Sequence, residues 1–170
     1  FWSSMVAYLY LLGDMKESIK LYQDLYDEVK YRVDNKIGAV EPERYRLAFG
    51  ELPPWHSLGF FDQLAERGWN FVIQSFAYQP PIPIEGIERI ADPLERNARL
   101  HLQFTTGYYK EAKKDGEYYG YMGYPYLVYV RDYKCDGVLL HPLITCRSAS
   151  THLPYVRDLV MRRAKVPSLM

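Results

Sequence analysis

Cys146 lies in the segment "HPLITCRSAS", residues 141–150, and is one of two cysteines in a chain of 170 residues. The preceding run "DGVLL" is typical of a buried strand, and we expect a helix to begin soon after the cysteine. A helix start presents unpaired N–H groups and the positive end of a dipole, which favour a thiolate. Cys146 is therefore a candidate nucleophile or metal ligand. A small, buried apolar side chain is the alternative, because free cysteines are often buried.

The residues that follow Cys146 support a charged or capped turn. Arg147 places a cation beside the thiol. Ser148, Ser150 or Thr151 is expected to cap the next helix, because a hydroxyl oxygen can accept a hydrogen bond from an unpaired N–H group. The turn therefore combines a thiol, a guanidinium group and several hydroxyl groups.

Two histidines lie within a dozen residues of Cys146, so a Cys–His pair for nucleophilic catalysis remains an open interpretation. His152 is part of the expected helix start, whereas His141 lies on the strand and can simply end it. Cys135 is eleven residues before Cys146, which is not a spacing typical of metal ligands. We interpret Cys135 as a packing residue.

Trp55 and His56 form a second group of candidates in "GELPPWHS", residues 50–57. They could line a pocket for an aromatic or acyl group, or Trp55 could anchor its loop to the core. Prolines lack the backbone N–H groups with which a glycine-rich loop binds phosphate, so this segment does not predict a phosphate site. The chain also contains no GxGxxG, Walker, GxSxG, HExxH or CxxC motif.

The elements that must position these residues follow a strand, helix, strand pattern. A strand over residues 45–49, a helix over residues 57–68 that closes with Gly68, and a strand over residues 69–76 form a βαβ unit. Such a unit predicts a parallel sheet. We expect a helix over residues 124–134, a strand in "VLLHPLI", a helix in "STHLPYVRDLVMRRAKV" and a further strand in "PSLM".

In an open α/β sheet, ligands bind outside the carboxyl ends of the strands. Three segments follow the predicted strands: "GELPPWHS", "AYQPP" and "HPLITCRSAS". The candidate residues Trp55, His56 and Cys146 are therefore expected at one edge of the sheet.

Two further helices are predicted outside this sheet. Residues 14–34 place apolar or aromatic side chains at intervals of three and four, which predicts one buried seam, and Asp14 is the expected N-cap. These seam residues are Met15, Ile19, Tyr22, Tyr26, Val29 and Val33. A second helix begins after Asp92, with Pro93 in its first turn. Residues 105–123, rich in Gly and Tyr, are expected to be irregular.

Composition excludes several classes of protein. Lys and Arg number 21, as do Asp and Glu, which argues against a dedicated nucleic-acid surface. No apolar run reaches the roughly 20 residues needed to span a bilayer, so we expect no membrane contact. Two cysteines form no disulfide framework, which favours a reducing cytoplasm. The 17 tyrosines suit interfaces and pocket walls, or a core with a polar rim.

Residues 40–170 resemble the 2-hydroxyacyl-CoA dehydratase family, with the closer likeness to catalytic subunits of ATP-dependent benzoyl-CoA reductase. The resemblance rests on four segments in this order: "RYRLAFGELPPWHSLGFFDQLAERGWNFVIQSF", "DPLERNARL", "YKCDGVLLHPLITCRSAS" and "AKVPSLM". Its strongest piece is "DGVLLHPLITCRSAS", where the family has an Asp-Gly-Val strand that leads to a Cys-Arg or Cys-Asp turn.

The resemblance implies a flavodoxin-like α/β lobe with helices on both faces of a parallel sheet, preceded by a helical segment. It implies a [4Fe–4S] cluster, a paralogous partner subunit, an ATP-hydrolysing activator that donates electrons, and an aryl- or acyl-CoA substrate. The implied activity is the transfer of single low-potential electrons to the CoA thioester, with reduction of benzoyl-CoA to a dienoyl-CoA preferred. Radical dehydration of a 2-hydroxyacyl-CoA is the alternative.

Within the resemblance, Cys146 matches the cluster ligand of the family's second lobe. Arg147, Ser148 and His152 are then expected to surround the cluster or the substrate pocket, with Trp55 and His56 as weaker pocket candidates. Cys135 matches no ligand position. We expect the chain to be a fragment, with residues 1–39 as a helical connecting segment and residues 40–170 as a lobe interrupted at its C-terminal end.

Two other functions remain open from the residues. A non-catalytic flavodoxin-like module would use its tyrosine-rich face to bind a partner protein. A thiol enzyme would use Cys146 with His152 and would need no iron.

Overall fold

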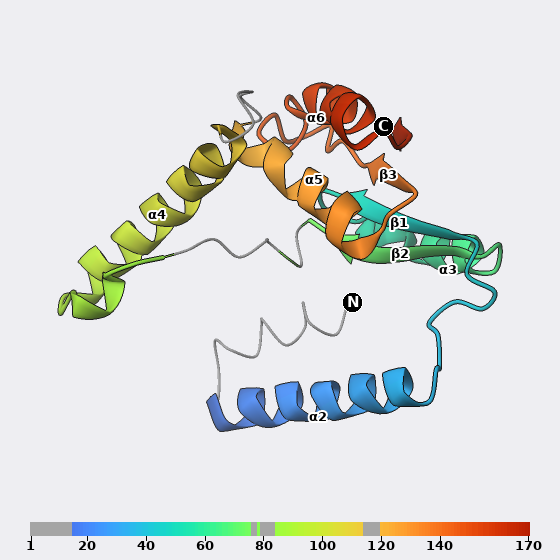
Figure 1. The fold of residues 1–170 in the computed structure, drawn as a ribbon, viewed down its shortest axis with the longest axis horizontal. Coiled ribbons are helices and arrows are strands. Elements are labelled where there is room, and N and C mark those ends of the chain that lie inside the picture. Colours follow the sequence, from blue (N-terminus) through green and yellow to red (C-terminus); the bar gives the residue numbers. More distant parts are fainter. Residues whose placement is uncertain (1–14, 76–77, 79–83, 114–119) are drawn as a thin grey trace.

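The structure, a computed structural model, describes residues 15–75, 78, 84–113 and 120–170 (Figure 1). At its centre is a four-stranded sheet in the order β2-β1-β3-β4, in which every neighbouring pair is parallel. The strands are β1 (Tyr45–Gly50), β2 (Trp69–Gln74), β3 (Gly137–Leu140) and β4 (Ser168–Leu169). The predicted α/β class with a parallel sheet is confirmed, and the strand order matches the start of the flavodoxin-like order.

Along each strand, successive side chains point alternately to the two faces of the sheet. Ala48 of β1 pairs with Val138 of β3, and both point into the main core. Phe49 points to the opposite face, where it contacts Phe61 and Phe71. Apolar residues on both faces explain why the strands read as nearly continuous apolar runs.

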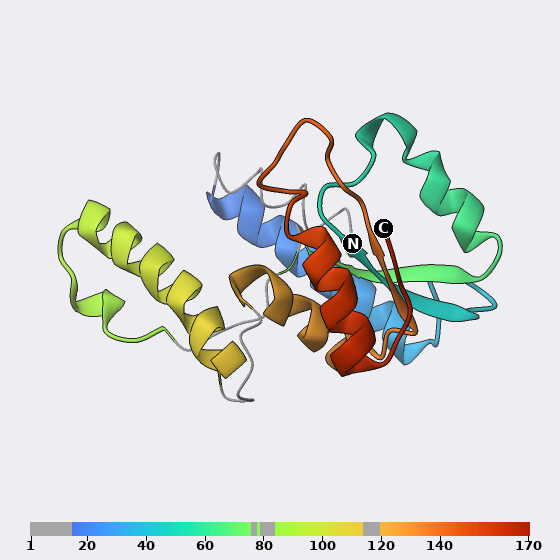
Figure 2. The same cartoon turned by 90° about the horizontal axis from the view of Figure 1, so that it is seen from above.

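Helices α5 (Gly120–Tyr133) and α6 (Leu153–Leu159) pack on the first face, and α6 continues as a π-helix over Val160–Ala164 (Figure 2). The helix predicted at residues 124–134 is confirmed and begins four residues earlier. The apolar spacing predicted for α6 also holds, because its inward residues are fully buried. The buried core on this face consists of Ala48, Ile73, Tyr126, Tyr129, Cys135, Val138, Leu140, Leu153, Val156 and Val160.

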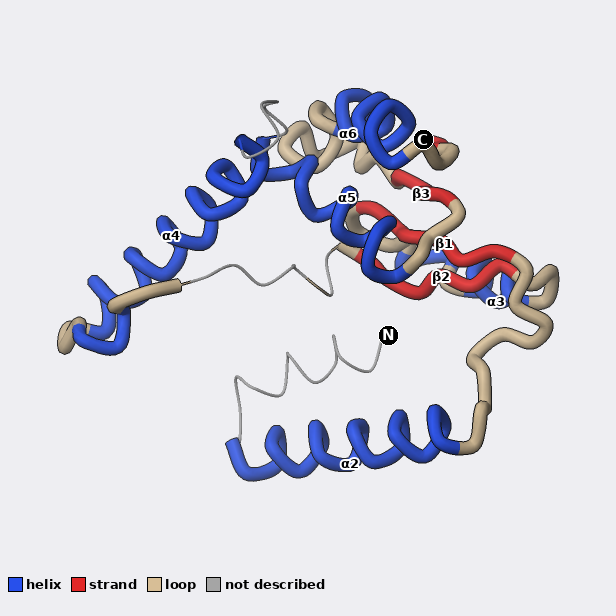
Figure 3. Tube along the Cα trace, viewed as in Figure 1, coloured by secondary structure: helices blue, strands red, loops and turns tan. Residues whose placement is uncertain are grey.

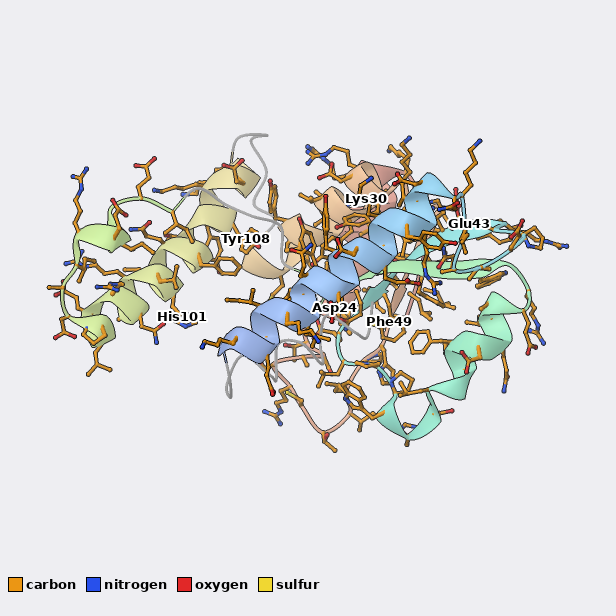
Figure 4. All side chains as sticks on the ribbon, turned by 90° about the horizontal axis from the view of Figure 1, so that it is seen from below. Asp24, Lys30, Glu43, Phe49, His101 and Tyr108 are labelled. Atoms are coloured by element: carbon orange, nitrogen blue, oxygen red, sulfur yellow. The ribbon has the colours of Figure 1, made fainter. Side chains whose placement is uncertain are left out.

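The short helix α3 (Gly59–Ala65) covers part of the second face beside β2. Phe61 of α3 packs edge-to-face against Phe49 and Phe71, with ring centroids 5.1 Å apart in both pairs. Figure 4 labels Phe49 in this layer between the strands and α3. The predicted helix over residues 57–68 is therefore shorter than expected, and Gly68, at φ +83°, closes the turn that follows it.

Helix α4 spans Pro93–Lys113 and leads away from the sheet (Figure 1). Asp92 caps it as predicted, because its Oδ1 accepts hydrogen bonds from the N–H groups of Leu94 and Glu95 at 2.8 and 3.3 Å. The expectation that residues 105–123 are irregular is wrong for residues 105–113, which continue the helix. Tyr108 explains the extension, because it is fully buried between Phe104 of its own helix and Tyr124 of α5.

Helix α2 spans Met15–Asp34, as predicted, and lies apart from the sheet (Figure 3). Its predicted buried seam is wrong: Ile19, Tyr26 and Val33 are 63%, 63% and 69% exposed. Periodicity identifies the face that a helix can bury, but a neighbouring element must also cover that face. The expected N-cap, Asp14, lies outside the described residues.

Ion pairs one turn apart explain how α2 keeps its helical form despite this exposure. Lys30 and Asp34 are 2.6 Å apart, and Arg32 and Glu28 are also 2.6 Å apart. Pairs at this spacing each stabilise a helix by about 0.2–0.5 kcal/mol. Across the described ranges, no helix combines the length and apolar character needed to cross a membrane.

Gly50 closes β1 where the sheet meets α5. A Cβ atom at this position would lie 2.6 Å from Leu140 Cδ2 and 2.7 Å from the Tyr126 hydroxyl oxygen. Both distances are far below van der Waals contact, so a side chain here would push α5 and β3 away from β1. Only glycine fits between these two neighbours.

We predict that Gly50→Ala lowers the free energy of unfolding of the chain by about 1–3 kcal/mol, the usual cost of overpacking a core. Gly59→Ala is the matched control, because nothing lies within 4 Å of its added Cβ, and it should leave stability unchanged or raise it. Urea unfolding followed by circular dichroism measures both variants. Equal unfolding free energies for the two variants would contradict the close approach at Gly50.

Candidate functional site

The carboxyl ends of β1, β2 and β3 lie at the same edge of the sheet, at Gly50, Gln74 and Leu140. The chain leaves β1 toward β2 on one side, whereas β3 pairs with β1 on the other side. This reversal of strand order is a topological switch point, where open α/β sheets form ligand crevices. The three strand ends therefore meet at the edge of the sheet where the sequence predicted the site.

Glu51 is the first residue after β1, and its backbone is in the left-handed region at φ +67°. This conformation is uncommon for any residue with a side chain and costs about 1–3 kcal/mol. Two neighbours from the end of β2 hold it in place. The Glu51 N–H group donates to Ser75 Oγ at 2.8 Å, and the Gln74 side-chain amide donates to the Glu51 carbonyl oxygen.

The Glu51 carboxylate contacts His152, which occupies the N-cap position of α6. Glu51 Oε1 is 3.0 Å from His152 Nε2, and the two side chains are only 13% and 15% exposed. The other ring nitrogen, Nδ1, is 3.2 Å from the Ser148 carbonyl oxygen. A carboxylate–imidazole pair therefore spans the switch point between the ends of β1 and β3.

Tyr126 of α5 supports this pair from the core side. Its hydroxyl donates to Ser75 Oγ at 3.2 Å and lies 3.5 Å from Glu51 Oε1. Burial, and then the negative charge of Glu51, raise the pKa of the Tyr126 phenol well above its ordinary value. The phenol is therefore neutral at physiological pH and acts as a hydrogen-bond donor.

His141 follows β3 and extends its pairing with β1. The His141 N–H group donates to the Gly50 carbonyl oxygen at 3.1 Å, and Nδ1 is 2.7 Å from the Leu52 carbonyl oxygen. The hydrogen bonds of His141 and His152 thus go to Leu52, Ser148 and Glu51. The Cys–His pair that the sequence left open is not formed.

Cys146 is half-buried in a turn six residues beyond β3. Its N–H group donates to the Leu143 carbonyl oxygen at 2.9 Å, and Ser150 Oγ donates to the same oxygen at 2.6 Å. Helix α6 begins only at Leu153. The helix expected soon after Cys146 therefore begins seven residues beyond it, and the residue lies on the carboxyl side of β3 as predicted.

The predicted hydroxyl cap of α6 is also wrong. Thr151 Oγ1 donates to the Arg147 carbonyl oxygen at 2.9 Å, and Ser150 Oγ bonds within the preceding turn, so neither caps the helix. His152 stands at the N-cap without a side-chain capping bond, followed by a proline in the first turn. That proline fixes where the helix begins, because it has no N–H group to satisfy.

The remaining candidates lie on the surface around this edge. Arg147 and Ser148 are exposed, and the structure uses their backbone carbonyl oxygens within the turn. Trp55 and His56 lie on a one-turn 3-10 helix after β1, and Trp55 is 51% exposed. Their role in a substrate pocket stays a prediction.

Cys135 is 4% exposed, and its Sγ is 3.5 Å from the Tyr129 carbonyl oxygen. Burial raises the pKa of the Cys135 thiol to about 12. Cys135 precedes β3 and Cys146 follows it, so the two thiols lie at opposite ends of the strand. The interpretation of Cys135 as a packing residue is confirmed.

These positions decide whether a four-iron cluster fits the chain's own residues. Such clusters take four protein ligands, usually thiolates, and the carboxyl edge offers the single thiol of Cys146. Within the described ranges, no three or more His, Cys, Asp or Glu side chains are grouped to hold a metal ion. These residues therefore do not fit a complete cluster, and Cys146 can supply one ligand.

A separate cavity of about 530 Å³ lies near the amino ends of the strands. Its lining is largely apolar and includes Tyr45, Leu47, Trp69, Leu139 and Leu169. It lacks a carboxylate–imidazole pair or a thiol. Arg44 and Asp136 also line this cavity, whereas the carboxylate–imidazole pair and Cys146 lie at the other edge of the sheet.

Sequence reasoning missed four residues of this site: Glu51, Gln74, Ser75 and Tyr126. A signal existed for Gln74 and Ser75, because two polar residues directly follow the apolar run of residues 71–73. Glu51 comes two residues after the predicted strand and could have been noted for the same reason. Tyr126 gave no signal among so many tyrosines.

Comparison with known families identifies a match over the whole length of the chain. The sequence model of the family described as "HGD-D: 2-hydroxyglutaryl-CoA dehydratase, D-component" matches residues 1–170. No curated protein matches the chain. The family match covers the carboxyl-edge residues Glu51, Cys146 and His152 together with every described element.

We predict that iodoacetamide at pH 8 labels Cys146 in the native chain and leaves Cys135 unmodified. A pKa of about 12 leaves roughly one Cys135 thiol in ten thousand ionised at this pH, and labelling should rise as the pH approaches 12. Peptide mass spectrometry measures both sites, with the urea-unfolded chain as the control in which both react. Equal labelling rates in the native chain would contradict the burial of Cys135.

Proposed function

Because the chain belongs to the 2-hydroxyglutaryl-CoA dehydratase D-component family, we propose that it works as part of a catalytic subunit that transforms a CoA thioester. The family match over residues 1–170 is the observation that carries this proposal. The site at the carboxyl edge supports it, because it places a carboxylate, an imidazole and a thiol near a topological switch point. A paralogous partner subunit and an ATP-hydrolysing electron donor complete the proposed system.

Among the reactions of CoA thioesters, we favour the reduction of benzoyl-CoA to a dienoyl-CoA by single low-potential electrons. The exposed indole of Trp55, beyond the end of β1, suits contact with a flat aryl group. The second candidate is dehydration of a 2-hydroxyacyl-CoA, which the family's description as a 2-hydroxyglutaryl-CoA dehydratase component favours. Both reactions would use the same edge of the sheet.

Cys146 is proposed as one ligand of a [4Fe–4S] cluster, with the other ligands supplied by cysteines outside these 170 residues. A bound cluster would supply single electrons at low potential. Arg147, Ser148 and His152, in the same loop, would surround it and tune its environment. This chain offers one thiol at the site, so its residues would supply one ligand and the surroundings of the cluster. We assign no step of the cluster's chemistry to them.

The choice of reaction can be tested with the complete subunit, expressed anaerobically with its partner subunit and supplied with ATP, reductant and the electron donor. Benzoyl-CoA and a 2-hydroxyacyl-CoA are offered separately, and products are identified by mass spectrometry. A dienoyl-CoA from the first supports reduction, and an enoyl-CoA from the second supports dehydration. Conversion of neither thioester would contradict the proposed function.

We predict that Cys146→Ala removes most of the iron from the complete complex and abolishes its low-temperature EPR signal, because one cluster ligand is lost. Cys135→Ala is the matched control, since that thiol is buried at the opposite end of β3, and it should retain its iron. Iron analysis and EPR of both variants measure the effect. A cluster that persists unchanged in Cys146→Ala would overturn the ligand assignment.

A further inference from the structure

Both ring nitrogens of His152 face hydrogen-bond acceptors at the carboxyl edge. Nδ1 lies 3.2 Å from the Ser148 carbonyl oxygen, which can only accept a hydrogen bond. Nε2 lies 3.0 Å from Glu51 Oε1. A hydrogen on each nitrogen would satisfy both contacts, and Glu51 and His152 would then hold one proton more than a carboxylate beside a neutral imidazole.

The two oxygens of the Glu51 carboxylate differ in their contacts. Glu51 Oε1 is engaged by His152 and approached by the Tyr126 hydroxyl. In the part of the chain that the structure describes, no hydrogen bond is formed by Glu51 Oε2. The side chains of Glu51 and His152 are 13% and 15% exposed, so a ligand or water can reach them although most of their surface is covered.

The surrounding structure fixes the pair in this arrangement. The left-handed backbone of Glu51 is held through Gln74 and Ser75. His152 is held by the start of α6, where Leu153 is fully buried. A surface ion pair would not need a strained backbone and two buried polar partners. Such preorganisation is typical of residues that act on a ligand.

We propose that Glu51 is a proton donor to the CoA thioester bound at this edge and that His152 recharges it. This inference rests on the proposed function and deepens it, because it names the group that supplies protons during the reaction. A one-electron reduction of the thioester leaves negative charge on the acyl group or its ring. Proton donation neutralises that charge and prevents the electron from returning.

The step balances without any further oxidant or reductant. The bond between His152 Nε2 and its hydrogen breaks as the hydrogen joins Glu51 Oε1, and the carboxylic acid formed in this way then gives that proton to the reduced substrate atom. The electron pair of the N–H bond stays on the imidazole, and the substrate atom supplies the pair for its new bond to hydrogen. The low-potential electron donor of the proposed system supplies the preceding electron, and water restores the proton.

The charged and titratable groups that face the pair are few. In the described ranges, Tyr126 of α5 is the titratable side chain that contacts it, and burial raises the pKa of that phenol so that it stays neutral. Ser75 and Gln74, from the end of β2, carry no charge. A pH dependence of proton delivery therefore reports on Glu51 and His152 themselves.

The inference is tested with Glu51→Gln in the complete complex, with Glu66→Gln, on an exposed turn after α3, as the matched control. Glutamine keeps the shape of the side chain but cannot relay a proton. We expect kcat to fall by about 100- to 10,000-fold, with KM and iron content unchanged and a changed pH profile of kcat. A Glu51→Gln complex with the wild-type kcat and pH profile would overturn the inference.

A second measurement separates this inference from the proposed function. Nitrogen-15 NMR of histidine-labelled chain, with His152 assigned through His152→Gln, reports which ring nitrogens carry hydrogen at neutral pH. Hydrogen on both Nδ1 and Nε2 supports the stored proton, and hydrogen on only one of them contradicts it, whether or not either thioester is converted. Failure of the wild-type complex to convert any thioester, with both nitrogens protonated, instead contradicts the proposed reaction.

Discussion

The parallel pairing of β1 with both β2 and β3 is the constraint on which the site depends. It brings the ends of three strands to one edge, so residues far apart in the sequence become neighbours. A bulge between Leu47 and Ala48 shifts the register with β2 and sets Gln74 opposite Phe49. Bulges re-aim side chains next to functional sites, and here the shifted strand end lets Gln74 and Ser75 reach the backbone of Glu51.

The polar groups at this edge are costly for stability, which is an argument for function. Gln74 is fully buried, and Ser75 and Tyr126 are 8% and 2% exposed. Buried polar groups are tolerated only when they are hydrogen-bonded, and these groups bond to one another and to Glu51. Proteins usually break local rules of stability at functional sites, and the left-handed Glu51 fits that pattern.

Much of the fold could be predicted because its signals are local. Apolar runs with glycine breaks identified β1, β2 and β3, and helical spacing identified α6. The exposed seam of α2 and the extension of α4 through Tyr108 could not be predicted, because both depend on which elements meet. The site divides in the same way: Cys146 and His152 carry reactive groups that attract attention, whereas Glu51 gains its importance from a partner 101 residues away.

The central claim is that the thioester reacts at the carboxyl edge, against Glu51 and the loop that holds Cys146. The most direct measurement is an anaerobic structure of the complete complex with a bound CoA thioester. We predict that the acyl group lies beside the Glu51 carboxylate and the turn of Cys146. An acyl group in the apolar cavity lined by Tyr45, Trp69 and Leu169, near the amino ends of the strands, would contradict this account.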